Sequence, residues 1–313
     1  MTQLSELTTM RVGGEPKALF EVNSKEELLR VADQVWDSTD NWFVLGGGSN
    51  VVANDLLGDL TVIRVNTKGI EQNGNRVMVA AGEDWHQFVM TANAKGWAGI
   101  ESLAGIPGTV GAAPVQNIGA YGQELSQTMT ALEFYDYETR ELLALDRGEC
   151  GFGYRDSEFK RGRRGIITSV EFEFKEADPS DLQAKSEEVL AQRRAKGMVL
   201  DSNDHDTWSC GSFFTNPFVT PSFARTLPLD MPQWEEGDMV KLSAAWLIEH
   251  AGVPKGFSLP NSKAAVSSKH SLAITNRGGA TSEEIVELAS LIQTQVGNTY
   301  GIYLVPEPNL IGF

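Results

Sequence analysis

The chain has 313 residues, of which 41% are hydrophobic, and its 26 Lys and Arg against 42 Asp and Glu give a formal net charge of −16. This length accommodates two domains, each with its own core. The acidic balance argues against nucleic-acid binding, because phosphate recognition needs clustered Lys and Arg. We interpret the charge as a solvated surface, on which a polyanionic ligand would need local cations.

No apolar run approaches the roughly 20 residues of a membrane span, and residues 1–9 lack the basic start and apolar stretch of a secretory signal. The two cysteines, Cys150 and Cys210, form no C-x-x-C pair, which fits a reducing cytoplasm. We expect both to pack in the interior, although a bulky reagent on Cys210 would lie two residues from Ser212. The histidines have no spacing that suggests a metal site. We therefore expect a cytoplasmic protein without membrane insertion or metal.

Along the first half of the chain, helix and strand patterns alternate. The capping box at 24–27 begins a helix whose apolar residues follow helical spacing to Trp36. The apolar run 42–45 predicts a buried strand, and strands are also expected at 61–65 and 77–81. A helix is expected from Asp84 to Lys95, closed by Gly96. His86 lies on this apolar-patterned helix, where a structural role is favoured.

The second half continues the mixture. Residues 166–175 alternate as a half-buried strand should, and the polar stretch 176–180 predicts a linker before a charged helix over 182–196. A second capping box at 281–284 starts a helix expected to end near Val296, and 302–305 is predicted as the final strand. We place one boundary near residue 178, which divides the chain into domains 1–178 and 179–313.

Two segments are rich in glycine. The first, 46–50, follows the strand at 42–45 directly, and the second runs from Gly105 to Ala113 and leads into 116–122. Successive glycines let backbone N–H groups turn toward a phosphate. Neither segment matches the dinucleotide or the P-loop fingerprint. One such loop alone is typical of a tight turn, but two are better explained by a long ligand that threads between them.

Three short motifs each carry one polar side chain able to do chemistry. They are 152–157 with Arg155, 211–217 with Ser212, and 304–308 with Glu307. Together a guanidinium, a hydroxyl and a carboxylate could hold a carboxylate, deliver a proton and polarise an enolate. Each alone has a plainer interpretation: an ion pair with Asp156, a turn cap and an exposed loop carboxylate.

These segments, in this order and spacing, resemble the UDP-N-acetylenolpyruvoylglucosamine reductase (MurB) family. The resemblance runs from Thr8 to Gly312, and its most specific pieces are 46–50, 106–111, 116–122, 153–157 and 211–217. It implies an α+β fold. The first domain would be the FAD-binding fold of the vanillyl-alcohol-oxidase (PCMH) type, built from two α/β lobes, and the second a smaller α+β substrate domain.

The resemblance also implies the reaction. A member of this family reduces UDP-N-acetyl-enolpyruvoylglucosamine to UDP-N-acetylmuramate for peptidoglycan, with NADPH as co-substrate and bound FAD. Ser212 would donate the proton, and Glu307 and Arg155 would polarise the enolate. We expect non-covalent FAD and a monomer.

The resemblance further assigns binding residues. FAD would be held by Gly46, Gly47, Gly48, Ser49, Asn50, Ile106, Gly108, Thr109, Gly111, Gln116 and Gly119. The UDP-sugar would be held by Arg193, Lys196, Asn216 and His270. On the residues alone, Arg193 and Lys196 share a helix face and could clamp a diphosphate, or they could form a solvated helix end.

One departure from the family is visible. Many members insert a tyrosine-containing segment that closes over the substrate, whereas residues 174–193 contain no tyrosine. The chain therefore resembles a shorter subtype, in which Trp208 is a candidate lid residue or packs at a rim.

Two rival functions remain open. A sugar or lactone oxidase would share the flavin loops without needing the Ser212 motif, and an inactive nucleotide-binding regulator would be expected to lack one of the three motif residues.

Overall fold

The computed structural model describes residues 2–313, which form two compact units. Unit 1 comprises the residues up to Glu15, Ser49–Leu57 and Ala195–Phe313, and unit 2 comprises Pro16–Gly48 and Gly58–Arg194. The chain therefore passes from one unit to the other inside the first glycine loop. The units are interleaved in sequence, whereas the sequence patterns place a single boundary near residue 178. The division into a cofactor domain and a substrate domain near residue 178 stays a prediction.

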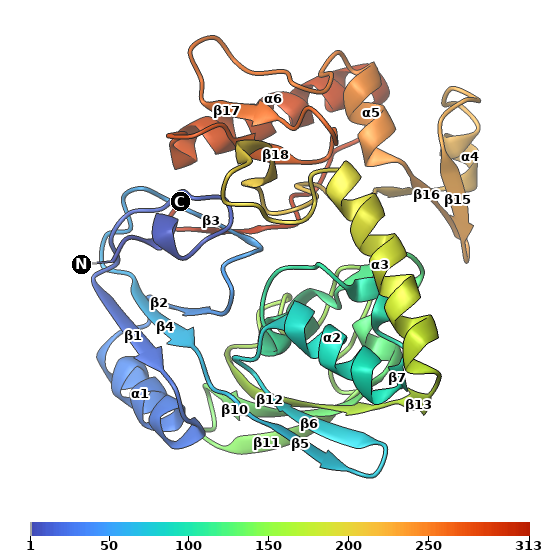
Figure 1. The fold of residues 1–313 in the computed structure, drawn as a ribbon. Helices are drawn as coiled ribbons and strands as arrows, with labels where there is room; N and C mark the ends of the chain where they lie inside the picture. Colours follow the sequence, from blue (N-terminus) through green and yellow to red (C-terminus); the bar gives the residue numbers. More distant parts are fainter. Residues whose placement is uncertain (1) are drawn as a thin grey trace. The chain divides into compact units, whose positions relative to one another are not determined.

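The first sheet of unit 2 has three parallel strands in the order β1-β4-β2. They are β1 (Ala18–Val22), β4 (Thr61–Val65) and β2 (Trp42–Leu45). Helix α1 (Lys25–Ser38) packs on this sheet (Figure 1) and begins at Ser24, whose hydroxyl accepts from the Glu27 N–H at 3.1 Å. Its predicted apolar face is buried from Leu28 to Trp36. The helix and both predicted strands are confirmed, although β2 is buried only at Leu45 and half-buried elsewhere.

The second sheet of unit 2 has five antiparallel strands in the order β11-β10-β12-β6-β5. They are β11 (Leu142–Asp146), β10 (Met129–Asp136), β12 (Gly165–Glu173), β6 (Arg76–Ala80) and β5 (Ile70–Asn73). The predicted alternation is confirmed from Val170 to Phe174, where Val170, Phe172 and Phe174 are buried and the residues between them are more exposed, whereas residues 166–170 are all buried. The central strand is covered on both faces: Ile166 packs with Ile63 of the first sheet, and the Phe172 ring lies 5.1 Å from that of Phe88.

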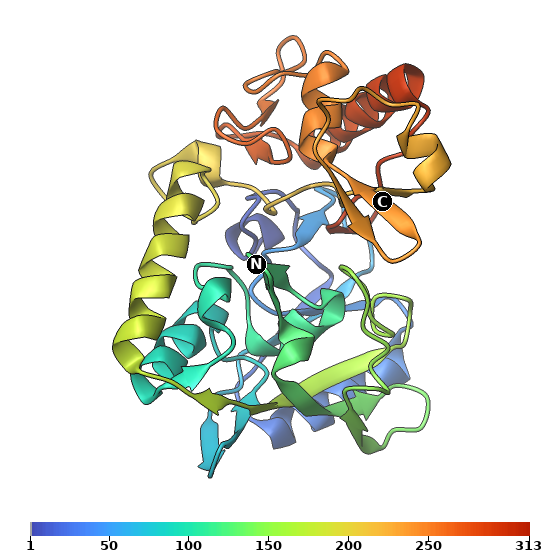
Figure 2. The ribbon, with the colours of Figure 1, turned by 90° about the vertical axis from the view of Figure 1, so that its right-hand side faces the viewer.

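Two helices accompany the second sheet. Helix α2 (Trp85–Lys95) is capped by Asp84 and ends at Gly96, which has a φ of 75°, as the sequence predicts. Helix α3 (Pro179–Ala195) runs beside it in both views (Figure 1 and Figure 2), and Asn93 donates to Ser186 between them at 2.7 Å. The predicted linker at 176–180 is wrong. Proline suits the first turn of a helix, where its missing N–H is not needed.

Unit 2 is completed by short elements. Its remaining strands are β7 (Trp97–Ala98), β8 (Gly119–Ala120), β9 (Gln123–Glu124) and β13 (Lys175–Glu176). Its 3₁₀ helices are η2 (Glu101–Leu103), η3 (Val110–Gln116) and η4 (Leu125–Gln127).

Unit 1 combines small sheets with helices around one hydrophobic core. Its strands are β3 (Val51–Ala53), β14 (Phe218–Val219), β15 (Gln233–Glu236), β16 (Met239–Leu242), β17 (Ala264–Val266), β18 (Ile274–Asn276) and β19 (Asn309–Ile311). Its helices are η1 (Leu4–Glu6), η5 (His205–Thr207), α4 (Pro221–Ala224), α5 (Ala244–His250) and α6 (Ser282–Tyr300). The parallel pair β19–β3 joins the end of the chain to Val51–Ala53.

Two predictions near the C-terminus are corrected. Helix α6 continues past Val296 to Tyr300, where Gly301 closes it with a φ of 68°. Residues 302–305 form no named strand, and the last strand is β19 instead. Residues 305 and 306 contact residues 214 and 215 through an isolated β-bridge and a backbone hydrogen bond. Pro306 has no N–H group, so it cannot extend this pairing into a regular strand.

Candidate active site

The two glycine-rich loops lie against each other within unit 2. A Cβ atom on Gly47 would come within 2.7 Å of the Gly108 Cα, and one on Gly46 within 2.5 Å of the Thr109 Oγ1. Side chains at these positions would push the loops apart, which is the physical reason for glycine here. The two predicted halves of one binding site are therefore in direct contact.

Several backbone N–H groups of these loops have no acceptor on the protein. Across residues 2–313, none accepts from the N–H groups of Gly47, Gly48 or Gly108. By contrast, the Val110 N–H donates to the Glu83 carbonyl and the Gly111 N–H to the Ala81 carbonyl. Adjacent N–H groups with no protein acceptor form a concave anion site. These N–H groups are donors of the kind that a pyrophosphate needs, and the lack of a side chain on Gly111 lets the loop pack closely against Ala81.

The start of the second loop is anchored to helix α2. The His86 Nδ1 accepts a hydrogen bond from the Gly105 N–H at 3.1 Å, which agrees with the structural role expected of this histidine. Ile106, another predicted cofactor residue, donates its N–H to the Leu103 carbonyl at 3.4 Å.

The rest of the first loop belongs to unit 1. The Asn50 carbonyl accepts from the Asn309 N–H at 3.0 Å, and the Asn50 side-chain amide donates to the Glu307 carbonyl at 3.4 Å. The segment Ser49-Asn50 is therefore tied to the end of the chain, beside the Glu307 motif.

Arg155 lies in a strained turn of unit 2. Its φ is 54°, and two further residues with positive φ, Asn117 at 44° and Tyr121 at 50°, lie in the predicted flavin segment. The Asn117 side chain donates to the Gly153 carbonyl at 3.1 Å, and the Arg155 guanidinium donates to the Gly119 carbonyl. Left-handed backbone at residues other than glycine concentrates at functional sites. The turn aims Arg155 at the 116–122 segment, where Gln116 ends η3.

The other two catalytic candidates are neighbours in unit 1. The Glu307 N–H donates to the Phe213 carbonyl at 2.8 Å, and the Thr215 N–H donates to the Val305 carbonyl at 3.0 Å. Gly211, with a φ of 75°, turns the chain just before Ser212. Ser212 is half-buried. The structure thus brings the two motifs together.

The predicted nucleotide-binding residues have different environments. Arg193 is 8% exposed and donates to the Gly105 carbonyl at 3.3 Å, so it is not part of a solvated helix end. Burial lowers the pKa of Arg193, and the electrostatic interaction with Tyr121 raises it by a smaller amount. Lys196 is exposed in the turn after α3 rather than within the helix.

The other two candidates lie in loops of unit 1. The Asn216 Oδ1 accepts from the Ala244 N–H at 3.0 Å, which fixes the side chain beside the start of α5. The loop that carries His270 is held by Asp206, which accepts from the Ser267 hydroxyl at 3.0 Å and the Ser268 hydroxyl at 2.9 Å.

Two further expectations concern Trp208 and Cys210. The centroid of the Trp208 ring lies 5.5 Å from the Arg11 guanidinium carbon and 4.1 Å from the centroid of the His205 ring. These contacts favour packing at a rim over a role as a lid.

Cys210 is buried, and its Sγ lies 3.1 Å from the Val51 carbonyl oxygen. Burial raises the pKa of Cys210 to about 12. The expected packing of Cys210 in the interior is confirmed, and its thiol is disfavoured as a target because the thiolate is the reactive form.

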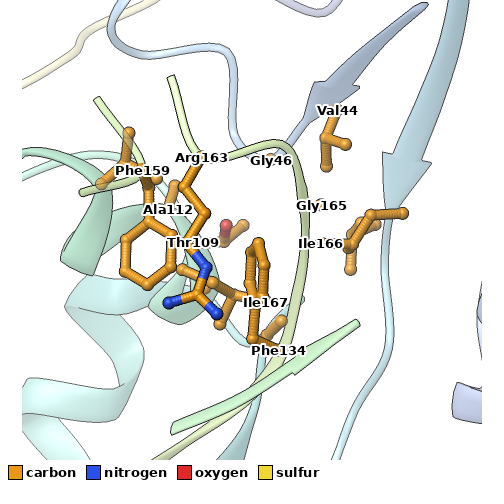
Figure 3. Close-up of a pocket in the computed structure, with 14 residues that line it drawn as sticks. Val44, Gly46, Thr109, Ala112, Phe134, Phe159, Arg163, Gly165, Ile166 and Ile167 are labelled. Atoms are coloured by element: carbon orange, nitrogen blue, oxygen red, sulfur yellow. The ribbon is translucent and has the colours of Figure 1, made fainter. Parts of the chain in front are cut away.

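Unit 2 also contains a cavity at the glycine loops. It encloses about 620 Å³ of empty space, counting its open mouth, and every lining residue belongs to unit 2. Gly46, Thr109 and Ala112 contribute to the wall, as do Phe134, Phe159 and Arg163 (Figure 3).

Among residues 2–313, no helix is long and apolar enough to cross a membrane. No group of three His, Cys, Asp or Glu in this part of the chain could hold a metal ion.

Known proteins resemble the chain over its whole length. A family model described as the UDP-N-acetylenolpyruvoylglucosamine reductase C-terminal domain matches residues 203–311, and one described as an FAD binding domain matches 16–142. A UDP-N-acetylenolpyruvoylglucosamine reductase from Leifsonia xyli is 44% identical, over 99% of this chain and 98% of that protein. The chain belongs to the UDP-N-acetylenolpyruvoylglucosamine reductase family.

Other members agree. The reductase from Streptomyces avermitilis is 41% identical, over 99% of this chain and 93% of that protein. A crystal structure of the Thermus caldophilus member covers 99% of this chain and 97% of that one, with 28% identity and a TM-score of 0.75. The predicted α+β fold with an FAD-binding domain is confirmed. The Leifsonia alignment extends over 369 positions, more than the 313 residues of this chain, so that relative carries insertions.

Sequence reasoning missed the cavity wall formed by Phe134, Phe159 and Arg163. Phe134 lies on β10, and the other two lie between the Arg155 motif and β12. The one available signal was position, since Phe159 follows the Arg155 motif by two residues. Neither an isolated aromatic nor an arginine in a basic loop indicates a cofactor contact without the tertiary fold.

Proposed function

We propose that this enzyme reduces UDP-N-acetyl-enolpyruvoylglucosamine to UDP-N-acetylmuramate with NADPH, in peptidoglycan precursor synthesis. One observation carries the proposal beyond family membership: the Ser212 and Glu307 motifs, 95 residues apart in sequence, pair through backbone hydrogen bonds in unit 1. A proton donor and a carboxylate held on one framework are what reduction of an enol ether beside a carboxylate requires.

Bound FAD would supply the hydride transfer between NADPH and the substrate, a chemistry that protein side chains do not provide. The chain's residues supply alignment and charge. Gly47, Gly48 and Gly108 would hold the pyrophosphate through their N–H groups. Nothing in this cradle requires a covalent bond, so we expect acid to release all of the flavin as FAD.

The reaction leaves negative charge on the substrate carboxylate as an enolate. Arg155 and Glu307 would polarise this group, and the Ser212 hydroxyl would give its proton to the adjacent carbon. A serine hydroxyl is a weak acid, and it becomes competent only opposite a strongly basic carbanion in a water-poor site. Gly211 and the Phe213 carbonyl contact would hold its backbone in place.

For the UDP moiety we propose Lys196, Asn216 and His270 as direct contacts. Arg193 would act nearer the cofactor, because its guanidinium bonds the carbonyl of Gly105 at the start of the second glycine loop. We further propose that the enzyme is a cytoplasmic monomer.

The decisive experiment follows the bound flavin after reduction by NADPH. Rapid reoxidation by UDP-N-acetyl-enolpyruvoylglucosamine, with slow reoxidation by oxygen, is the expected result. Rapid reoxidation by oxygen alone would identify an oxidase and overturn the proposal. Absence of flavin from the purified protein would instead indicate a nucleotide-binding regulator.

A further inference from the structure

Arg163 projects into the unit 2 cavity in a fixed arrangement. Its guanidinium carbon lies 5.1 Å from the centroid of the Phe134 ring, and the Phe159 ring lies 5.1 Å from that of Phe134. Its Nε lies 3.6 Å from a carboxylate oxygen of Asp136. Figure 3 shows the guanidinium turned toward the space beside both rings.

Most of the remaining wall is apolar. Val44, Val65, Ile166 and Ile167 line the cavity together with Ala81. The Phe134 ring can lie flat against the backbone because residue 165 is glycine, and a Cβ there would collide with the ring and with the Tyr135 carbonyl. A mostly apolar pocket with one planar cation suits an aromatic base.

We propose that Arg163 forms one wall of the site for the adenine of FAD, and that it selects FAD over FMN. The guanidinium is planar and stacks on aromatic faces. Asp136 engages its Nε, which leaves the outer nitrogens directed at the base. Gly46 and Thr109, which also line the cavity, belong to the loops that would hold the pyrophosphate. The proposal rests on the bound FAD of the proposed function.

The cavity suits adenine rather than the flavin ring. The reacting ring must lie beside Arg155, whose guanidinium bonds the Gly119 carbonyl. Neither Arg155 nor Gly119 lines the cavity. The cavity therefore takes the end of the cofactor that does not react.

The sequence connects the two ends of this arrangement. Residues 155–165 carry Arg155 at one end and Arg163 and Gly165 at the other, with Phe159 between them. Ser157, inside this segment, donates to the carbonyl of Val115, which also lines the cavity. Adenine binding and the position of Arg155 are thus linked through one loop.

The test compares affinities for FAD and FMN in Arg163→Met. Release of FAD from diluted holoenzyme is followed by flavin fluorescence, and the protein stripped of FAD is titrated with FMN. We expect the FAD Kd to rise about 3- to 30-fold, in keeping with the loss of a cation–π contact. The FMN Kd and the absorption spectrum of bound flavin should not change.

Two further variants keep the test decisive. Arg164→Met is the matched control, since the Arg164 guanidinium also lies over an aromatic ring, 4.2 Å from the Tyr137 centroid, but does not line the cavity. It should lower stability and leave the FAD Kd unchanged. If Arg163→Met does not fold, Arg163→Lys, which keeps the charge but not the plane, should still weaken FAD selectively.

Three results would overturn the proposal: an unchanged FAD Kd in Arg163→Met, an equal loss of FMN and FAD affinity, or an altered flavin spectrum. The last two would place the flavin ring or its phosphate in the cavity. None of them depends on turnover, so each can be told apart from a failure of the proposed reaction.

Discussion

The backbone N–H of Glu307 donates a hydrogen bond to the carbonyl oxygen of Phe213 at 2.8 Å. Together with the bond from the Thr215 N–H to the Val305 carbonyl, it sets the last motif of the chain beside the serine motif. Asn50, from the first glycine loop, donates its side-chain amide to the Glu307 carbonyl at 3.4 Å. The segments that carry a proton donor, a carboxylate and part of a cofactor loop thus share one backbone network.

Replacing Ser212 by alanine should separate the two half-reactions. The change removes the proposed proton donor but no group on the path from NADPH to flavin. Stopped-flow absorbance should show flavin reduction near the wild-type rate, with reoxidation by the enolpyruvyl substrate slowed about 10²–10⁴-fold. Ser290→Ala, on the exposed face of α6, is the matched control. An equal loss of rate in flavin reduction and in flavin reoxidation would point to a blocked or misfolded site.

Lys196 should contribute charge to nucleotide binding. It is exposed in the turn after α3, so its attraction for a diphosphate should weaken as salt screens it. Lys196→Ala should raise the KM for the UDP-sugar about 10-fold, with a smaller effect on flavin reduction by NADPH and a flatter salt dependence. Steady-state kinetics at several ionic strengths would measure this.

The control for that experiment is Lys185→Ala, an exposed lysine of α3 whose ammonium pairs with Glu188 at 2.9 Å. It should leave the KM unchanged. An unchanged KM in Lys196→Ala would mean that another cation holds the diphosphate.

Glu133 should stabilise unit 2 in a pH-dependent way. Burial alone would raise the pKa of Glu133, but hydrogen bonds from Ser169 and Lys25 outweigh burial and hold the pKa below its ordinary value. A folded-state pKa below the unfolded one gives stabilisation that is complete above about pH 4.3 and lost as pH falls through the folded value.

Glu133→Gln should therefore lower the free energy of unfolding by about 0.5–1.5 kcal/mol at pH 7. The difference from wild type should shrink at about pH 3.5. Urea unfolding at saturating FAD would measure both values. Glu71→Gln, on the exposed strand β5, is the control and should change stability little at either pH. A gap of the same size at both pH values would exclude an ionic contribution from Glu133.

Both cysteines should resist thiol reagents. Burial raises the pKa of Cys150 and of Cys210 to about 12, so the reactive thiolate is scarce at pH 8. Labelling of the native enzyme by a chromogenic disulfide should be at least about 100-fold slower than labelling in denaturant. Rapid loss of activity on labelling of Cys210 would contradict its buried position.

Local signals in the sequence were sufficient where an element depends on its own residues. Asp84 and Gly96 delimit helix α2 because a side-chain cap and a left-handed glycine act on the nearest turn alone. The glycine loops were equally readable, since closely spaced glycines reveal where backbone must approach backbone or ligand. Residues 302–305 show the limit, because an apolar run predicts a strand but cannot supply a partner for it.

Tertiary structure decided what depends on residues far apart in the chain. It buries Arg193 against Gly105, 88 positions away, where helix spacing alone left a clamp and a solvated end equally open. It places Arg163 over Phe134, and Glu307 against Phe213, although no local pattern connects either pair. Burial and long-range pairing are properties of the packed chain, because the contacts that create them form between segments whose sequences carry no information about their distance in space.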